Sequence, residues 1–145
     1  MNAALEVGRF GSGKTVRRIE DPSLVAGKGQ FTDDLNRPGQ THLIFVRSPY
    51  AHARIVSVDL SGALALPGVV AAYSGAALLS AGVTPIPAGI PFPRPDGTPA
   101  ASPTRYALAV DRVRYVGEAV AAVVAESRAA ALTGVDAVRI EYEEL

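Results

Sequence analysis

The sequence contains no cysteine and no tryptophan, and only 6% of its residues are aromatic. Without cysteine, the chain itself can hold no disulfide, no thiolate metal site and no iron–sulfur cluster. It also has no charge excess, because 14 Lys and Arg residues balance 14 Asp and Glu residues. Nucleic-acid-binding domains usually show a basic excess and stacking aromatic side chains, so we expect no nucleic-acid partner.

A membrane anchor or an export signal is not expected either. The N-terminal residues MNAALEVGRF lack an apolar run behind a basic stretch, which predicts a cytoplasmic protein. Leu60–Pro93 is uncharged over a length that would suffice for a membrane helix. Pro67, Gly68 and five prolines within Pro85–Pro95 interrupt it, however, and proline breaks a helix. We therefore expect a strand, a short helix and a loop there, and no membrane partner.

One motif points to nucleotide chemistry. Gly8–Thr15 reads GRFGSGKT, which matches the phosphate loop of nucleotide hydrolases. In such a loop Lys14 would contact the terminal phosphates and Thr15 would bind magnesium. The motif requires a buried strand before it and a helix after it, whereas only seven residues precede it and Asp21-Pro22 soon follows. We interpret residues 1–17 as a flexible arm and keep a small nucleotide-binding protein as the alternative.

The strongest structural signal is an apolar run near the C-terminus. Ala119–Ala125 consists of seven small or β-branched apolar residues, bounded by Gly117-Glu118 and Glu126-Ser127. Such a short run between turn residues predicts a strand that is buried on both faces. With 145 residues, of which 48% are hydrophobic, the chain is long enough for one domain built around this strand.

Weaker patterns predict the remaining elements. Strands are expected at Thr41–Arg47, Ala51–Asp59, Val69–Ser74, Arg105–Asp111 and Val138–Glu144, and Val113–Ala125 is expected to kink or bulge at Gly117. Short helices are expected at Gly62–Leu66, capped by Ser61, and at Gly75–Gly82. A longer helix is expected at Arg128–Ala137, capped by Ser127, with its buried face formed by Ala131, Leu132, Val135 and Val138. Gly134 is expected to weaken this helix.

Few side chains suggest chemistry. His42 and His52 are the only histidines, and without neighbouring thiols or paired carboxylates they make a poor metal site. The charges between Arg17 and Asp21 compensate one another, which favours a solvated segment that turns and leads toward the first strand. Val83–Thr104 is rich in Pro, Gly, Ala and Ser and too long for a simple turn, so it is either a docking loop or an insertion.

A set of short motifs in a fixed order identifies a family resemblance. The chain resembles the N-terminal α/β hammerhead domain of the molybdenum-cofactor subunit of the xanthine dehydrogenase, aldehyde oxidase and carbon monoxide dehydrogenase family. The matching residues are Arg18-x-Glu20-Asp21, Gly27-x-Gly29-x-Phe31-x-x-Asp34, Arg47-Ser48-Pro49-Tyr50-Ala51-His52-Ala53-Arg54-Ile55, Pro67-Gly68-Val69, Val113-x-Tyr115-Val116-Gly117-Glu118-Ala119-Val120-Ala121 and Glu141-Tyr142. The resemblance implies an α+β fold for residues 18–145, a mixed sheet with short covering helices.

The resemblance also implies a function and its limits. Family members continue for several hundred residues beyond the point that matches Leu145, and they carry the cofactor loops and the catalytic glutamate there. No catalytic, cofactor-binding or metal-binding residue is therefore assigned to this chain. The assembled enzyme would oxidise an aldehyde, a heterocycle or a similar small substrate with a molybdopterin cofactor, iron–sulfur clusters and FAD. The implied partners are a molybdopterin-binding domain, in the same or a companion chain, and an iron–sulfur subunit.

Several expectations about assembly follow. The chain is expected to be a structural domain, either a fragment or a separately encoded subunit, that contacts its partner through Arg47–Arg54 and Val83–Thr104. A homodimer is a second way to cover its apolar surface. A non-catalytic, stand-alone binding module remains a further alternative. Leu132-Thr133-Gly134-Val135 departs from the acidic, alanine-rich helix usual in the family, which places the stability of that helix in question.

Overall fold

The computed structural model describes residues 18–87 and 92–145, and the chain divides into two compact units at Pro38/Gly39. In the first unit, the described residues form the short helix α1 (Asp21–Val25) and the 3-10 turn η1 (Thr32–Asp34). The Asp34 carboxylate accepts a hydrogen bond from the Phe31 backbone N–H at 2.9 Å. Neither element contains a buried residue. The predicted arm at residues 1–17 lies outside the description, and a domain boundary at residue 18 stays a prediction.

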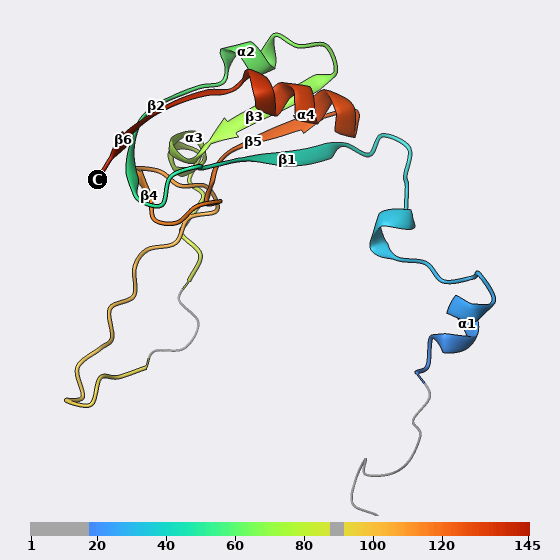
Figure 1. Cartoon of the computed structure of the whole chain (residues 1–145), viewed down its shortest axis with the longest axis horizontal. Helices are drawn as coiled ribbons and strands as arrows, with labels where there is room; N and C mark the ends of the chain where they lie inside the picture. Colours follow the sequence, from blue (N-terminus) through green and yellow to red (C-terminus); the bar gives the residue numbers. More distant parts are fainter. Residues whose placement is uncertain (1–17, 88–91) are drawn as a thin grey trace, which may run out of the picture. The chain divides into compact units, whose positions relative to one another are not determined.

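The second unit contains two three-stranded antiparallel sheets (Figure 1). The first has the order β1-β5-β3, formed by His42–Arg47, Ala119–Ala125 and Val69–Ser74. The second has the order β4-β2-β6, formed by Arg112–Val113, Ala53–Asp59 and Arg139–Glu144. The helices are α2 (Ser61–Leu64), α3 (Gly75–Ser80) and α4 (Arg128–Ala137).

The α+β hammerhead fold is confirmed, but the expected mixed sheet is wrong. All four strand pairs are antiparallel. A strand–helix–strand unit such as β5–α4–β6 makes its two strands parallel when both belong to the same sheet. Instead β6 pairs with β2, which places the two strands in different sheets.

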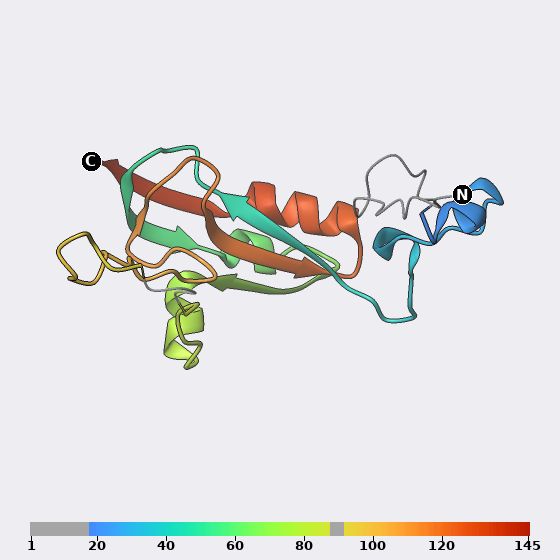
Figure 2. The ribbon, with the colours of Figure 1, turned by 90° about the horizontal axis from the view of Figure 1, so that it is seen from below.

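The central strand is confirmed where the sequence placed it. β5 lies between β1 and β3, and Val120, Ala121, Val123 and Ala125 are fully buried. Helix α4 covers one face of this sheet, and α3 lies on its other side (Figure 2). Two hydrophobic clusters form the core, and the half-buried Val58 and Ile140 of the second sheet extend the cluster beneath α4. The two sheets therefore share one core.

Helix α4 has the predicted bounds, and the Ser127 hydroxyl accepts a hydrogen bond from the Ala130 N–H at 3.2 Å. The predicted buried face needs a correction, because Leu132 is 46% exposed whereas Gly134 is buried. A Cβ on Gly134 would lie 2.7 Å from Cγ1 of Val123. Glycine at this position lets the helix approach β5 closely, which outweighs its low helix propensity.

Other boundaries also differ from the prediction. Ser61 begins α2 but does not cap it; the Asp59 carboxylate accepts a hydrogen bond from the Ser61 N–H at 2.9 Å. Residues 105–111 form no strand, because their backbone groups bond to other segments: Ile55 N–H to Asp111 O at 2.9 Å and Ala109 N–H to Ala119 O at 2.8 Å. The predicted continuous strand from Val113 is divided by a turn in which Gly117 has φ +88°. No described helix is long and apolar enough to cross a membrane.

Candidate functional site

The predicted contact segment Arg47–Arg54 connects the two sheets. Backbone hydrogen bonds tie Ser48 to the turn before β5, with Ser48 N–H donating to Glu118 O at 2.9 Å and Gly117 N–H donating to Ser48 O at 2.8 Å. The Arg47 guanidinium donates to Gly117 O at 2.8 Å and also lies 5.6 Å from the Phe45 ring centroid. Ser48 is only 2% exposed. The segment therefore makes structural contacts within the domain, and its predicted role in binding a partner remains untested.

Tyr50 of this connection packs against Tyr142 of β6. The rings of Tyr50 and Tyr142 are 5.0 Å apart and tilted by 51°. Burial raises the pKa of Tyr142, and the nearby Ser48 hydroxyl only partly opposes this shift. That hydroxyl already bonds with the backbone N–H and C=O of Tyr50. Among the described residues, the buried Tyr142 hydroxyl has no hydrogen-bond partner.

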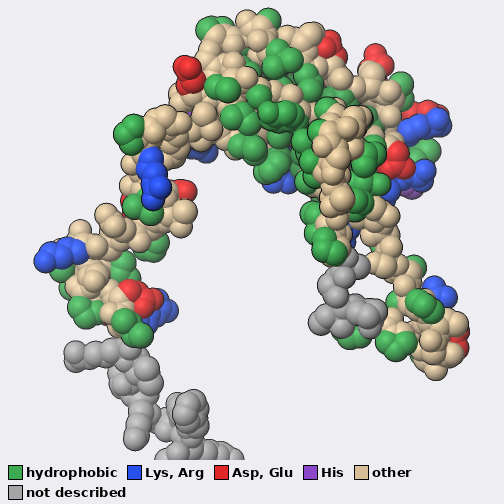
Figure 3. All heavy atoms as spheres, turned by 180° about the vertical axis from the view of Figure 1, so that it is seen from behind, with side chains coloured by type: hydrophobic (Ala, Val, Ile, Leu, Met, Phe, Trp, Pro, Cys, Tyr) green, Lys and Arg blue, Asp and Glu red, His purple; other side chains and the backbone are tan. Residues whose placement is uncertain are grey.

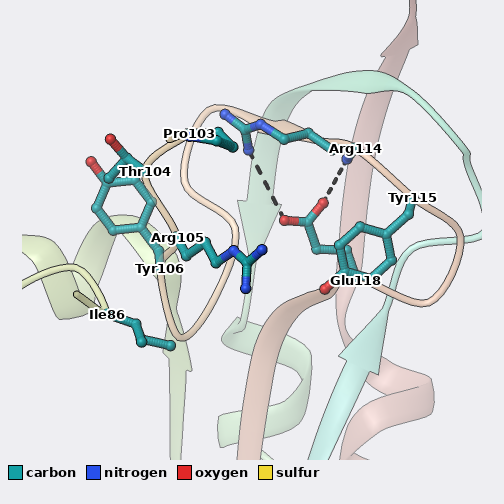
Figure 4. A pocket seen from close by; sticks show the side chains of 8 residues that line it. All are labelled: Ile86, Pro103, Thr104, Arg105, Tyr106, Arg114, Tyr115 and Glu118. Carbon is teal, nitrogen blue, oxygen red and sulfur yellow. Dashed lines mark hydrogen bonds and ion pairs between the residues drawn. The ribbon is translucent and has the colours of Figure 1, made fainter. Parts of the chain in front are cut away.

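A recess with a volume of about 480 Å³ lies where the Val83–Thr104 loop rejoins the domain (Figure 4). Its charged side chains are Arg105, Arg114 and Glu118, and the other lining residues are Ile86, Pro103, Thr104, Tyr106 and Tyr115. The Glu118 carboxylate accepts from the Arg114 backbone N–H at 2.5 Å and lies 4.0 Å from its guanidinium. Sequence reasoning missed this recess because it placed residues 105–111 in a strand. The loop's predicted docking role remains untested, and residues 88–91 lie outside the description.

The carboxylates beside the recess are neutralised locally. Asp111 forms ion pairs with Arg112 at 3.1 Å and with Arg114 at 3.4 Å. Burial by itself would raise the pKa of Asp111, but the hydrogen bond from Arg112 and the positive charges of Arg114 and Arg112 together lower it. Arg114 also faces Glu118, so this cation is shared between two carboxylates. The arrangement stabilises the turn before β5.

Within residues 18–87 and 92–145, no group of three or more His, Cys, Asp and Glu side chains could hold a metal ion. His42 begins β1 and His52 lies in the loop before β2. The complete sequence contains no thiolate for a cluster. We therefore derive no reaction step on this chain. The phosphate-loop candidate Gly8–Thr15 lies outside the described residues.

The surface that stands out is an uncovered apolar face of the β1-β5-β3 sheet. Leu43 and Phe45 on β1 and Tyr73 on β3 are 51%, 40% and 43% exposed. The sequence contained the signal for this surface, because a central strand with no polar residue predicts burial on both faces. On this face α3 lies beside β3 and Ala122 of β5 is buried, but Leu43, Phe45 and Tyr73 remain exposed.

Comparison with known proteins agrees with this architecture. Residues 26–145 match the family model described as "Aldehyde oxidase and xanthine dehydrogenase, a/b hammerhead domain". The match excludes Gly8–Thr15, so it lends the nucleotide-binding alternative no support.

Individual relatives are much longer than this chain. The nicotine 6-hydroxylase large subunit of Paenarthrobacter nicotinovorans is 46% identical over 134 residues, which are 92% of this chain and 16% of the relative. The carbon monoxide dehydrogenase large chain of Afipia carboxidovorans is 36% identical, and the match covers 93% of this chain and 15% of that protein.

A solved structure of quinoline 2-oxidoreductase from Pseudomonas putida 86 is similar in fold, with a TM-score of 0.80 and 39% identity over 92% of this chain and 16% of that chain. Another solved structure, reconstituted CO dehydrogenase from Oligotropha carboxidovorans, gives a TM-score of 0.75 with 36% identity, and the match covers 92% of this chain and 15% of that chain. The chain belongs to the aldehyde oxidase and xanthine dehydrogenase family, in which it corresponds to the a/b hammerhead domain.

Proposed function

We propose that this chain is the hammerhead part of a molybdenum hydroxylase large subunit and supports the cofactor-binding part without taking part in the chemistry. The observation that carries this proposal is the family match over residues 26–145, within relatives of which the chain spans only about a sixth. The described residues hold no candidate metal site. A supporting role accounts for a well-packed fold with an uncovered apolar face.

The cofactors of the assembled enzyme are proposed to lie outside this chain. One related structure is that of a Cu,Mo-CO dehydrogenase, which supports a molybdenum centre in the complete protein. When bound, a molybdopterin cofactor would supply hydroxylation with water-derived oxygen, and iron–sulfur clusters and FAD would carry the electrons away. Because this chain has no cysteine, the clusters must be held by an iron–sulfur subunit or by another part of the assembly.

We further propose a nitrogen heterocycle as the substrate, within the broader class of aldehydes, heterocycles and similar small molecules. Identity is 46% with the nicotine 6-hydroxylase large subunit and 39% with quinoline 2-oxidoreductase, against 36% with a carbon monoxide dehydrogenase large chain. The proposed location is the cytoplasm.

The test is reconstitution of the enzyme. The remaining part of the large subunit is produced with the iron–sulfur partner, with and without this chain, and hydroxylation of nicotine, quinoline and an aldehyde is followed with an artificial electron acceptor. We expect activity only when the chain is present, together with stable co-purification. Full activity in its absence would contradict the supporting role. A chain that never associates with the cofactor-binding polypeptide would instead favour a stand-alone binding module.

A further inference from the structure

This chain buries the two faces of the central strand β5 to different extents. Ala121 and Val123 are fully buried in the cluster beneath α4. Successive strand residues point to opposite faces, so Ala122 and Val124 point away from α4. At the other end of β5, Val120 is fully buried in a cluster with Ala109 and Val113. The domain therefore covers the face beneath α4 and one end of β5. On the rest of the second face Ala122 is buried, while Leu43, Phe45 and Tyr73 on the flanking strands stay 40–51% exposed.

The open face carries two rows of apolar side chains that cross all three strands. Strand register aligns Phe45, Ala122 and Tyr73 in one row, and Leu43, Val124 and Ala71 in the next. Directly opposed residues share a face, so these six residues form one surface, which we call the platform. Three of its side chains are 40–51% exposed, and it includes no charged residue. The view from behind shows hydrophobic side chains gathered on the sheet domain (Figure 3).

The exposed face of the second sheet, unlike the platform, carries mostly polar side chains. Most residues of this sheet alternate between buried or half-buried apolar positions and exposed polar positions, and Val56 of β2 is an exposed apolar exception. On the exposed side, Arg54 pairs with Glu143 at 3.0 Å, and the Ser57 hydroxyl donates to the Glu141 carboxylate at 2.9 Å. Such alternation is the usual pattern of a solvated sheet face. The platform lacks it, which indicates a surface that is covered in the working protein.

We propose that the platform is the docking surface for an apolar helix or strand face of the cofactor-binding polypeptide, the part that the relatives carry outside this segment. This inference rests on the proposed function and names the surface through which it operates. The relatives are about six times longer than this chain, so a covering polypeptide is present in them. The six platform residues are uncharged and include two aromatic rings, and the Arg47 guanidinium beside Phe45 already donates to the Gly117 carbonyl. This surface therefore fits an apolar occupant, because a charged one would be desolvated without a partner.

Thiol labelling tests the surface directly, because this chain contains no cysteine of its own. Leu43→Cys and Tyr73→Cys place single thiols on the platform. Val56→Cys is the matched control, since Val56 is 57% exposed on β2, in the other sheet. Each variant is assembled with the remaining part of the large subunit and the iron–sulfur partner, exposed to maleimide, and mapped by mass spectrometry of this chain's peptides. Its labelling rate is divided by the rate of the same assembly in denaturant.

We expect both platform thiols to label at least about tenfold more slowly than the control in the native assembly. Equal rates in an assembly that has formed and is active would overturn the platform proposal while leaving the proposed function intact. Failure of the unsubstituted chain to assemble would overturn the proposed function and the platform with it. Protection in the purified chain alone that grows with its concentration would show a second copy on the platform, and would also overturn the proposal.

Discussion

Gly134 of helix α4 lies directly against Val123 of β5: a Cβ at position 134 would come within 2.7 Å of Val123 Cγ1 and 3.2 Å of Val69 Cγ2. Val123 is fully buried and β-branched, so it has little freedom to move aside. The contact sets how closely the helix packs on the sheet.

This contact predicts that Gly134→Ala destabilises the domain. The higher helix propensity of alanine would stabilise α4 by up to about 1 kcal/mol, but overpacking against Val123 would cost about 1–3 kcal/mol. We therefore expect the free energy of unfolding to fall. Chemical denaturation of the chain measures it. Thr133→Ala, at the exposed neighbouring position, is the control and should slightly stabilise the helix. A Gly134→Ala variant more stable than the parent would show that α4 can move away from the sheet at no cost.

The cap of the same helix gives a second prediction. Because the Ser127 hydroxyl accepts from the Ala130 N–H, Ser127→Ala should lower the free energy of unfolding by about 1 kcal/mol. Ser80→Ala, at the exposed last position of α3, should change it by less than about 0.5 kcal/mol. Equal effects of the two substitutions in thermal unfolding would argue against the cap.

The elements predicted well from the sequence are those whose local signals agree. The run Ala119–Ala125, the strand Val69–Ser74 and the helix Arg128–Ala137 all have the predicted bounds. In each case composition, periodicity and the flanking turn or cap residues indicate the same structure. Local signals of this kind do not depend on which other segment supplies the packing.

Tertiary hydrogen bonding explains the failures. Residues 105–111 have strand-like composition, but their backbone bonds go one at a time to Ile86, β2 and β5, so no ladder forms. β6 pairs with β2 and not with β5. The choice of partner strand depends on tertiary packing, which no local sequence pattern reports. Because Leu132 is large and apolar, the sequence pattern predicts it on the buried face of α4. In the structure Gly134 is the residue that lies against β5, and Leu132 is exposed. The recess around Arg105 depends on these same long-range contacts.

The unpaired Tyr142 hydroxyl gives a third prediction. A buried hydroxyl without a partner keeps its desolvation cost, so Tyr142→Phe should raise the free energy of unfolding by about 0.5–1 kcal/mol. Tyr142→Ala removes the ring that packs against Tyr50 and should lower it by about 2–4 kcal/mol. Calorimetric or denaturant unfolding of both variants checks the pair. A clear loss of stability in Tyr142→Phe would mean that the hydroxyl is bonded after all.

Asp111 predicts a dependence of stability on pH. Its carboxyl has a pKa below the ordinary value of 3.8, so its contribution to stability is present above that value and is lost as pH falls through the folded-state pKa. Asp111→Asn should therefore destabilise the chain at neutral pH, by no more than about 1 kcal/mol because the ion pairs are partly exposed. The difference from the parent should shrink in acid.

The two arginines at the ends of the Arg47–Arg54 connection are expected to contribute unequally to the stability of the domain. Arg47 donates to the Gly117 carbonyl and lies over Phe45, so it fixes the turn that leads into the central strand. Arg54 pairs with Glu143 while both side chains remain more than half exposed, and such pairs contribute little. We expect Arg47→Ala to lower the free energy of unfolding by about 1–2 kcal/mol and Arg54→Ala by less than about 0.5 kcal/mol. Hydrogen exchange should also speed up at Gly117 in the Arg47 variant alone, because Gly117 N–H bonds to Ser48 O within the same turn. If both variants unfold at the same denaturant concentration, the turn is held by its backbone hydrogen bonds and the guanidinium is dispensable.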